Sequence, residues 1–306
     1  MSAAGAQGLG GGIAYPIEPP VFEPGVRASA TYSDNIFLRP PGREYGDLLF
    51  EVSPYITARS NAPRASYSVF YQMRNFLRVR EGNVDLMRQA LDARGSFALV
   101  DDRLWLDATG YMGNVSQSAT GAISADPGAS FDNNASVRRF SISPWYRDRI
   151  CDIASYTLRY SLAHNGGNND FVLSKIDQSA TAVVDGIPSS SRWNWRWHGE
   201  YQLRDYGSGI TRERRSSGAV LYYNVDPTLR VFGTIEYEQI EGLRNSDGDD
   251  FGYGPGAGFD WRPNARTNVS ASVSHRYYGT VGEARASYTR GHSTMGIQYS
   301  RSVLSS

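Results

Sequence analysis

Polar and apolar residues alternate one by one along residues 193–205, Trp-Asn-Trp-Arg-Trp-His-Gly-Glu-Tyr-Gln-Leu-Arg-Asp. One series contains Trp193, Trp195 and Trp197, and the interleaved series contains charged residues. Successive side chains of a β-strand point to opposite faces of its sheet, so this segment predicts a strand with one aromatic face and one charged face. A soluble sandwich strand also alternates, but it seldom lines its apolar face with three tryptophans. About ten tilted, alternating residues form one strand of an outer-membrane barrel.

The same alternation recurs along the chain and predicts about fifteen strands. They are expected near residues 26–38, 48–59, 66–74, 87–99, 104–113, 137–146, 154–162, 175–184, 193–205, 217–224, 229–239, 253–261 and 269–277, with a final hairpin within 283–301. The expected fold class is all-β, an antiparallel up-and-down transmembrane β-barrel of roughly 14–16 strands. Residues 1–24, rich in Gly, Ala and Pro, are expected to form an extended lead-in, and residues 25–306 the barrel.

Long polar connections follow the first, fifth, seventh, ninth and eleventh predicted strands, and short turns such as residues 60–64 and 262–266 separate them. Outer-membrane barrels have short periplasmic turns and long outer loops. This sorting by length favours a barrel over a sandwich or an elongated soluble sheet. An incomplete barrel stays open as an alternative, because the predicted strand count is odd and the chain ends without the aromatic residue usual in such barrels.

All six tryptophans lie within a few residues of a short turn, which predicts an aromatic girdle at a membrane–water interface. The predicted girdle consists of Trp105, Trp145, Trp193, Trp195, Trp197 and Trp261.

The polar series of several strands is predicted to point into the lumen of the barrel. The candidates are Arg74, Arg88, Arg94, Arg159, Arg196, His198, Glu200, Arg204, Glu236 and Glu238. Mixed arginines and carboxylates can set the selectivity of a pore and hydrogen-bond sugar hydroxyls. The alternative is that they pair with one another and fill a hydrated interior. Four glycines at period two, Gly252 to Gly258, indicate a bend or a close approach of another segment.

Composition and motifs narrow the chemistry. The 31 basic and 31 acidic residues balance, so no net field recruits nucleic acid, and a single cysteine excludes an intramolecular disulfide. No pair among His164, His198, His275 and His292 has metal-ligand spacing, and the segment Asp247-Gly-Asp-Asp250 lacks the further ligands of a calcium loop. We therefore expect no metal, no cofactor and no catalysis. The N-terminus has neither the basic region nor the apolar core of a signal peptide, which an outer-membrane protein requires.

The order of several short segments resembles the PEP-CTERM system-associated outer-membrane β-barrel family of exosortase and exopolysaccharide loci. These segments are Ala30-Thr-Tyr-Ser-Asp-Asn-Ile-Phe-Leu38, Glu51-Val-Ser-Pro-Tyr55, Ser141-Ile-Ser-Pro-Trp145, Leu229-Arg-Val-Phe-Gly233, Gly258-Phe-Asp-Trp-Arg-Pro-Asn-Ala-Arg-Thr267 and His275-Arg-Tyr-Tyr-Gly279. Each segment is short, and the similarity lies in their order over residues 26–301. Members of this family usually begin with a signal peptide and continue with further strands, and this sequence departs from both features.

The resemblance implies a role in passing or anchoring surface polysaccharide. The expected function is a channel or secretion component in a Gram-negative outer membrane, with membrane lipid, an exopolysaccharide and periplasmic export components as partners and no nucleic acid. Two alternatives come from other classes. One is a non-conducting scaffold or adhesin-like barrel that binds partners through its outer loops, and the other is a hydrolase with a Ser–His pair on the barrel wall.

Overall fold

The computed structural model describes residues 19–36, 40–80, 86–116, 134–167, 174–187, 192–207, 209–242, 250–276, 279–291 and 293–301. These residues form fifteen β-strands of 9 to 17 residues. The strands are β1 (Val21–Ser33), β2 (Asp47–Ala62), β3 (Ala65–Arg78), β4 (Leu86–Val100), β5 (Leu104–Ser116), β6 (Asn134–Ile150), β7 (Ala154–Gly167), β8 (Lys175–Gly186), β9 (Trp193–Asp205), β10 (Thr211–Asn224), β11 (Leu229–Glu241), β12 (Asp250–Asn264), β13 (Thr267–Arg276), β14 (Gly279–Arg290) and β15 (Ser293–Arg301).

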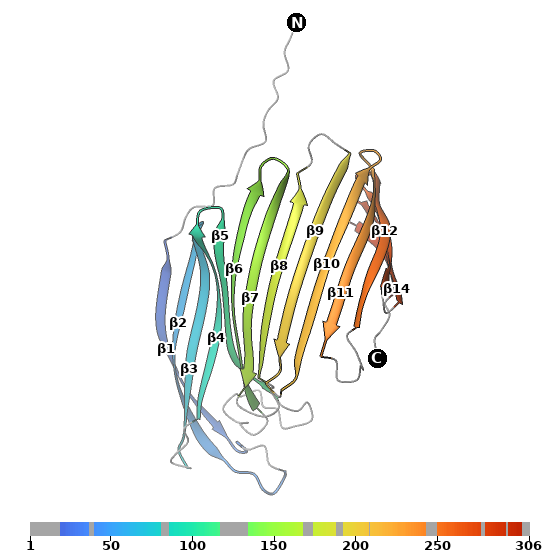
Figure 1. Ribbon diagram of the computed structural model, residues 1–306. Coiled ribbons are helices and arrows are strands. Elements are labelled where there is room, and N and C mark those ends of the chain that lie inside the picture. Colours follow the sequence, from blue (N-terminus) through green and yellow to red (C-terminus); the bar gives the residue numbers. More distant parts are fainter. Residues whose placement is uncertain are drawn as a thin grey trace.

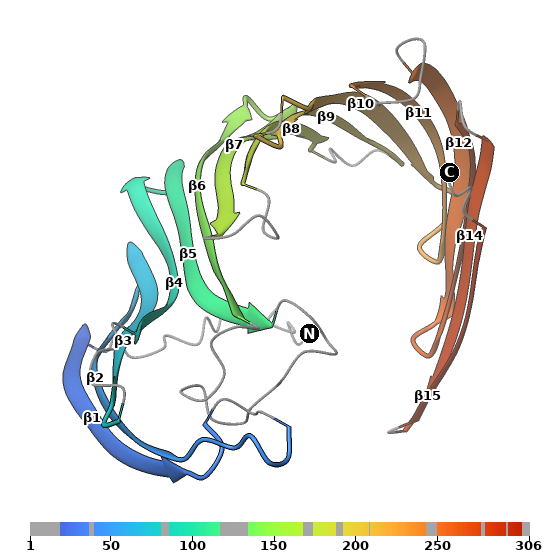
Figure 2. The same cartoon turned by 90° about the horizontal axis from the view of Figure 1, so that it is seen from below.

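The strands form one sheet in chain order, and each strand pairs antiparallel with the next (Figure 1). Within the described residues, β1 pairs only with β2 and β15 only with β14, so the sheet is not closed. Seen along the strands, it curls into a C-shaped wall with β1 and β15 at its two ends (Figure 2). The expected all-β, antiparallel up-and-down class is confirmed, and the described part of the chain contains no helix long and apolar enough to cross a membrane.

The two faces of the wall differ in chemistry. Residues directly opposite in an antiparallel pair share a face, and one row of such partners crosses nine strands. That row is Ala98, Trp105, Trp145, Arg159, Thr181, Glu200, Ser216, Glu238 and Gly252. We call the face that carries this row the inner face and the opposite one the outer face.

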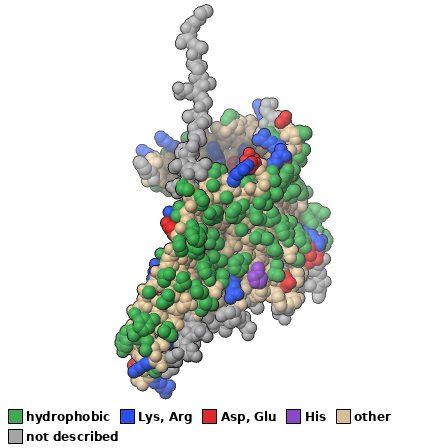
Figure 3. Space-filling model, turned by 90° about the vertical axis from the view of Figure 1, so that its left-hand side faces the viewer, with side chains coloured by type: hydrophobic (Ala, Val, Ile, Leu, Met, Phe, Trp, Pro, Cys, Tyr) green, Lys and Arg blue, Asp and Glu red, His purple; other side chains and the backbone are tan. Residues whose placement is uncertain are grey.

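Exposed large hydrophobic residues cover the outer face from β1 to β15. They include Val26, Phe50, Leu77, Met87, Phe140, Leu158, Ile176, Trp195, Leu221, Ile235, Tyr253, Val273, Tyr288 and Ile297. Figure 3 shows this apolar surface on the convex side of the wall, over the part of the sheet that is seen from the left-hand side of Figure 1. The inner face is therefore the concave one.

The described residues enclose almost no apolar core. The buried hydrophobic residues are Ile36, Leu49, Phe76, Ala135, Val137 and Ala154. Ile36, Leu49 and Phe76 form one small cluster with Tyr45, where the segment after β1 returns to the start of β2. The accessible surface is 21073 Å², whereas a compact monomer of this mass exposes roughly 13,000 Å². The described residues form no second layer over either face of the sheet.

The connections separate into two rims. The turns after even-numbered strands define the short-turn rim, and most are tight. Residues 63–64 join β2 to β3 and residues 101–103 join β4 to β5, where Asp102 adopts a left-handed φ of 57°. The connections after odd-numbered strands define the long-loop rim and include the long segments 34–46 and 117–133. The sorting is incomplete, because β13 and β14 are joined at the long-loop rim by residues 277–278 alone.

Two strands, β1 and β10, begin five or six residues earlier than expected. β1 begins at Val21, so residues 21–24 belong to the sheet, and the rest of the predicted lead-in up to residue 18 lies outside the described residues. β10 begins at Thr211, whereas the pattern predicts a strand from residue 217. The segment Thr-Arg-Glu-Arg-Arg, residues 211–215, has no apolar member to reveal alternation, but it pairs with β9 in an unbroken register.

Candidate functional site

All ten residues predicted to face a lumen lie on the inner face. Arg74 lies opposite Arg88, Arg94 opposite Thr109, and Arg196 opposite Asp185. His198 and Arg204 share the parity of Glu200 on β9, and Glu236 shares that of Glu238 on β11. The alternation rule of a pleated strand therefore placed these side chains on a single surface.

Most charged residues of the inner face pair across neighbouring strands. Arg74 on β3 forms a bidentate ion pair with Glu51 on β2, with Nε–Oε1 and Nη2–Oε2 distances of 2.6 Å. Further pairs join Arg204 to Asp177 (2.5 Å), Arg196 to Asp185 (2.6 Å) and Arg230 to Asp260 (2.6 Å). Arg159 on β7 reaches past β6 to Asp107 on β5, at 2.9 Å. Arg94 lies 3.8 Å from Asp92 on its own strand.

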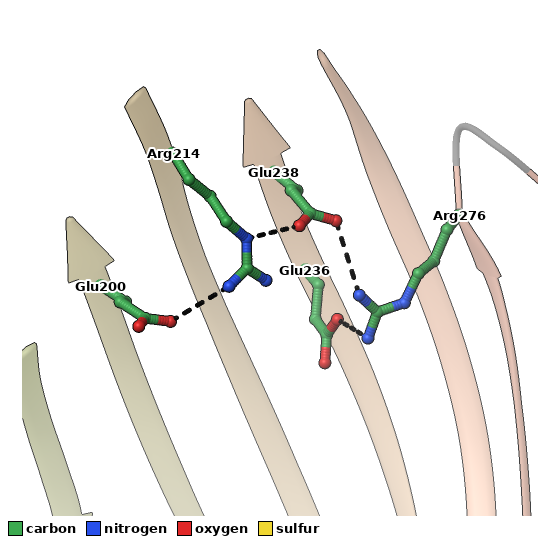
Figure 4. A network of polar contacts seen from close by, with 5 residues as sticks. All are labelled: Glu200, Arg214, Glu236, Glu238 and Arg276. Atoms are coloured by element: carbon green, nitrogen blue, oxygen red, sulfur yellow. Dashed lines mark hydrogen bonds and ion pairs between the residues drawn. The ribbon is translucent and has the colours of Figure 1, made fainter. Parts of the chain in front are cut away.

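The longest ionic chain, which we call the inner ion network, spans β9 to β13 (Figure 4). Arg214 lies between Glu200 (Nη1–Oε2, 3.5 Å) and Glu238 (Nε–Oε1, 2.8 Å). Arg276 lies between Glu238 (Nη1–Oε2, 3.6 Å) and Glu236 (Nη2–Oε2, 2.6 Å). Glu238 thus joins the two arginines, and its side chain is the least exposed of the five at 13%. Three carboxylates and two guanidinium groups nearly balance, so the wall is strongly polar with little net charge.

Glycines make room for these long side chains. Gly252, Gly254, Gly256 and Gly258 lie on the inner face of β12 opposite Glu238, Glu236, Thr234 and Phe232. A Cβ at Gly256 would lie 2.5 Å from Thr234 Oγ1, and a Cβ at Gly218 on β10 would lie 2.6 Å from His198 Cε1. The glycine stripe therefore lets the side chains of neighbouring strands lie across the sheet, which is one of the two roles the sequence indicated for it.

The tryptophans do not form one outward girdle. Trp193, Trp195, Trp197 and Trp261 lie on the outer face and are 53%, 39%, 38% and 43% exposed. Trp105 and Trp145 lie on the inner face, directly opposite each other on β5 and β6. Their rings stack with centroids 5.6 Å apart and an interplanar angle of 7°. Proximity to a short turn gave the level of these two residues along the strand but not the face on which they lie.

The outer face becomes polar near the long-loop rim. Arg215 on β10 pairs with Glu213 on the same strand and lies 3.9 Å from Glu241 on β11. Tyr237 donates a hydrogen bond to Gln239, which in turn donates one to Glu241. On β10 and β11 the apolar surface of the outer face thus ends below this rim.

The described histidines and acidic residues form no recognisable metal cluster. Within the described residues, no group of three or more His, Cys, Asp or Glu side chains could hold a metal ion. His164 and His275 point to the outer face, opposite Phe140 and Thr280, and only His198 lies on the inner face. His292 and the loop 243–249 lie outside the described residues.

The sequence missed two members of the inner ion network. Arg214 lies before the strand that the alternation predicts from residue 217, whereas β10 begins at Thr211. Arg276 continues the polar series of Ser270, Ser272 and Ser274 on β13, and this parity was available in the sequence. The acidic partners Glu51, Asp107, Asp177, Asp185 and Asp260 also share the polar parity of their strands.

No protein-family model matches the chain, and no curated protein matches it. Two solved structures are similar in shape. One is described as a bacterial polysaccharide outer membrane secretin, with a TM-score of 0.40 and 9% identity over 90% of this chain and 88% of that chain. The other is the outer membrane protein OprD from Pseudomonas aeruginosa, with a TM-score of 0.34 and 10% identity over 92% and 93%. At these scores the likenesses carry no argument about function.

Proposed function

We propose that the protein is a β-barrel component of a Gram-negative outer membrane whose inner face lines a hydrated passage for a polar polymer, an exopolysaccharide in the first instance. One observation carries the proposal. Exposed large hydrophobic residues cover the outer face of the whole sheet, while the inner face carries cross-strand ion pairs. A sheet of this kind has lipid as its natural solvent on one side and water on the other.

Dimensions support lipid as the partner of the outer face. A tilted strand of about 9–11 residues crosses the hydrocarbon layer of a membrane, and these strands have 9 to 17 residues. The polar cluster of Glu213, Arg215 and Glu241 then lies at a membrane surface rather than in hydrocarbon. Backbone groups at an open sheet edge are costly inside lipid, so the functional barrel needs its edges paired. By analogy with other barrels, the long-loop rim faces outward and the short-turn rim faces the periplasm.

The inner face suits a polar cargo and discriminates only weakly between cargoes of different charge. Paired charges hold each other in place and still offer donors and acceptors to sugar hydroxyls and water. Because the inner ion network is nearly neutral, it exerts no strong selection for ions of one sign. The role of the wall is passage, and the proposal includes no chemical step.

Reconstitution into planar lipid bilayers tests the proposal. The folded protein should give steady ion current, and liposomes that contain it should swell in isotonic oligosaccharide. Folded protein that inserts but carries no current would instead support the non-conducting scaffold that binds partners through its loops. A polypeptide that stays monodisperse in buffer without detergent, with the outer-face tryptophans shielded from water, would overturn both.

A further inference from the structure

The indoles of Trp105 and Trp145 form a stacked pair on the inner face, which is lined mainly by serines, threonines and charged side chains and also carries the aromatic pairs Tyr55–Phe70 and Tyr222–Phe232. On the side away from Trp105, the guanidinium group of Arg159, the cross-strand partner of Trp145 on β7, lies against the Trp145 ring, with Cζ 5.7 Å from the ring centroid. Arg159 is held in turn by Asp107, at 2.9 Å. Ion pair, cation–π contact and ring stack together fix the two indoles as a rigid platform.

Small residues lie next to the platform on its other side. The partner of Trp105 on β4 is Ala98, and Ser96 lies opposite Asp107. A cavity of ≈ 810 Å³ at the short-turn rim is lined by Ser96, Trp105 and Trp145, by Ile187, and by charged and polar residues of the adjoining turns and strand ends. This volume is in the range of sites that hold small molecules or a few sugar units.

Three arginines line the same cavity, together with the carboxylates of Asp102 and Asp148. Arg147 and Arg149 on β6 share the inner-face parity of Trp145 and line the cavity with Arg103. Arg103 pairs with Asp148 at 3.3 Å, whereas neither Arg147 nor Arg149 has an ion-pair partner among the residues that the structure describes. This contrasts with the inner ion network, in which both arginines are bound to two carboxylates.

We infer that Trp105, Trp145, Arg147 and Arg149 form a binding site for an acidic saccharide, with carboxylate-bearing rings as its ligand. The C–H face of a pyranose ring packs on the electron-rich face of an indole. The planar guanidinium groups bind the carboxylate through paired N–H donors. The inference deepens the proposed function, since it gives the passage a first docking point at its short-turn rim and a preferred class of cargo.

Calorimetric titration of the detergent-folded protein with hexagalacturonate, an acidic probe, and maltohexaose, a neutral one, tests the site. The wild type should bind the acidic hexamer more tightly. Trp105→Leu and the double variant Arg147→Gln/Arg149→Gln should each weaken that binding at least about ten-fold, equivalent to about 1.4 kcal/mol. The double variant should also lose most of the salt dependence of binding.

Matched controls separate binding from folding. Trp105→Phe keeps a stacking face and should restore most of the affinity, while Trp193→Leu, on the outer face, and Arg266→Gln, in the β12–β13 turn of the same rim, should change it less than about two-fold, well below 1 kcal/mol. Absence of binding by the wild type, equal affinity for the neutral hexamer, or equal losses in the controls would each overturn the inference. Current through planar bilayers is scored separately. A conducting protein that does not bind the acid defeats only this inference, and a non-conducting protein that binds it defeats only the proposed passage.

Discussion

The two faces of the sheet use the same backbone and different side-chain partners. On the inner face, long charged side chains reach neighbouring strands, so that Arg74, Arg196 and Arg204 each find a carboxylate one strand away. On the outer face, residues such as Trp193 and Ile235 remain exposed and have no covering layer in the described chain. Most charged groups of the inner face are therefore paired within the sheet, whereas the outer face has no protein partner among the described residues.

The tryptophans make the difference concrete. Trp195, with 39% exposure on the outer face, lies where the proposal places lipid. Trp145, on the inner face, instead packs within the protein, because its ring lies between Trp105 and Arg159. Residue type alone therefore does not assign a tryptophan of this fold to a membrane girdle. What assigns it is whether the residue falls in the apolar or the polar series of its strand.

The largest effect is expected from a charge in the middle of the outer face. Ala180 and Thr181 are neighbours at the centre of β8, and Ala180 lies opposite Tyr201 while Thr181 lies opposite Glu200. Ala180→Arg should lower the free energy of unfolding in lipid vesicles by about 2–4 kcal/mol. Thr181→Arg, which gains a carboxylate neighbour, should change it by less than about 1 kcal/mol. Urea titration in vesicles measures both, and equal losses would break the distinction between the faces.

The next effect should come from the centre of the inner ion network. Glu238→Gln removes the charge shared by Arg214 and Arg276 and leaves each arginine with one carboxylate, Glu200 or Glu236. We expect a loss of about 1–2 kcal/mol in the free energy of unfolding, less than for a fully buried pair because both arginines are partly exposed. Glu236→Gln, which has one partner, should cost less. A cycle that combines Glu238→Gln with Arg214→Gln should show a coupling above about 0.5 kcal/mol, and additivity would show that the bonds contribute no stability.

A smaller difference should separate inner from outer tryptophans. Trp145→Leu loses the ring stack and the contact with Arg159, which together contribute about 1 kcal/mol. Trp195→Leu exchanges one apolar side chain for another toward lipid and should stay within about 0.5 kcal/mol. Urea unfolding in vesicles of the two variants and the wild type provides the comparison, and the reverse order would contradict the assignment of faces.

The smallest effect is expected at a turn that belongs to neither face. Asp226, between β10 and β11, accepts hydrogen bonds from the hydroxyl and backbone N–H of Thr228 and from the backbone N–H of Leu229. The Thr228 hydroxyl, followed by the backbone N–H groups, holds the pKa of this carboxyl below its ordinary value of 3.8. Because the folded-state pKa is lowered, the stabilisation is present above pH 3.8 and is lost as the pH falls through the folded-state value.

The wild type should therefore lose stability relative to Asp226→Asn below pH 3.8, and the two should run parallel above it. The turn lies outside the span of both faces, so the difference should be the same in detergent and in lipid. Unfolding curves collected over this pH range in both media provide the measurement. A gap between the two proteins that widens above pH 4 would contradict the sign.

The sequence predicted the fold well because the pleat has a period of two. The alternation of Trp193 to Asp205 required a strand with two unlike faces, and the same rule placed Arg74 to Glu238 on one face. Strand ends were harder to predict. The start of β10 at Thr211 is set by pairing with Asp205 of β9, a long-range fact that a run of charged residues does not reveal.

The contacts within the site depend on the pairing register between neighbouring strands, which the alternation of polar and apolar residues does not specify. That Arg276 lies near Glu236 and Glu238 follows from the positions of β11, β12 and β13 and from glycines that leave space between them. The inward direction of Trp105 could have been predicted, since it shares the parity of Asp107 and Thr109 while Leu104 and Leu106 form the apolar series. The ring stack itself requires Trp145 to be its cross-strand partner, and only the three-dimensional pairing shows this.

The tight connection between β2 and β3, closed by Ala62 pairing with Ala65, has a consequence for how this protein tolerates change. Deletion of one residue there would shift the register of the next strand by one residue. Every apolar side chain of that strand would then move to the inner face and every polar one to the outer face. A single deletion at that hairpin should thus be worse than any point substitution on the same strand. Residues inserted into the long connections of the long-loop rim should change the free energy of unfolding little.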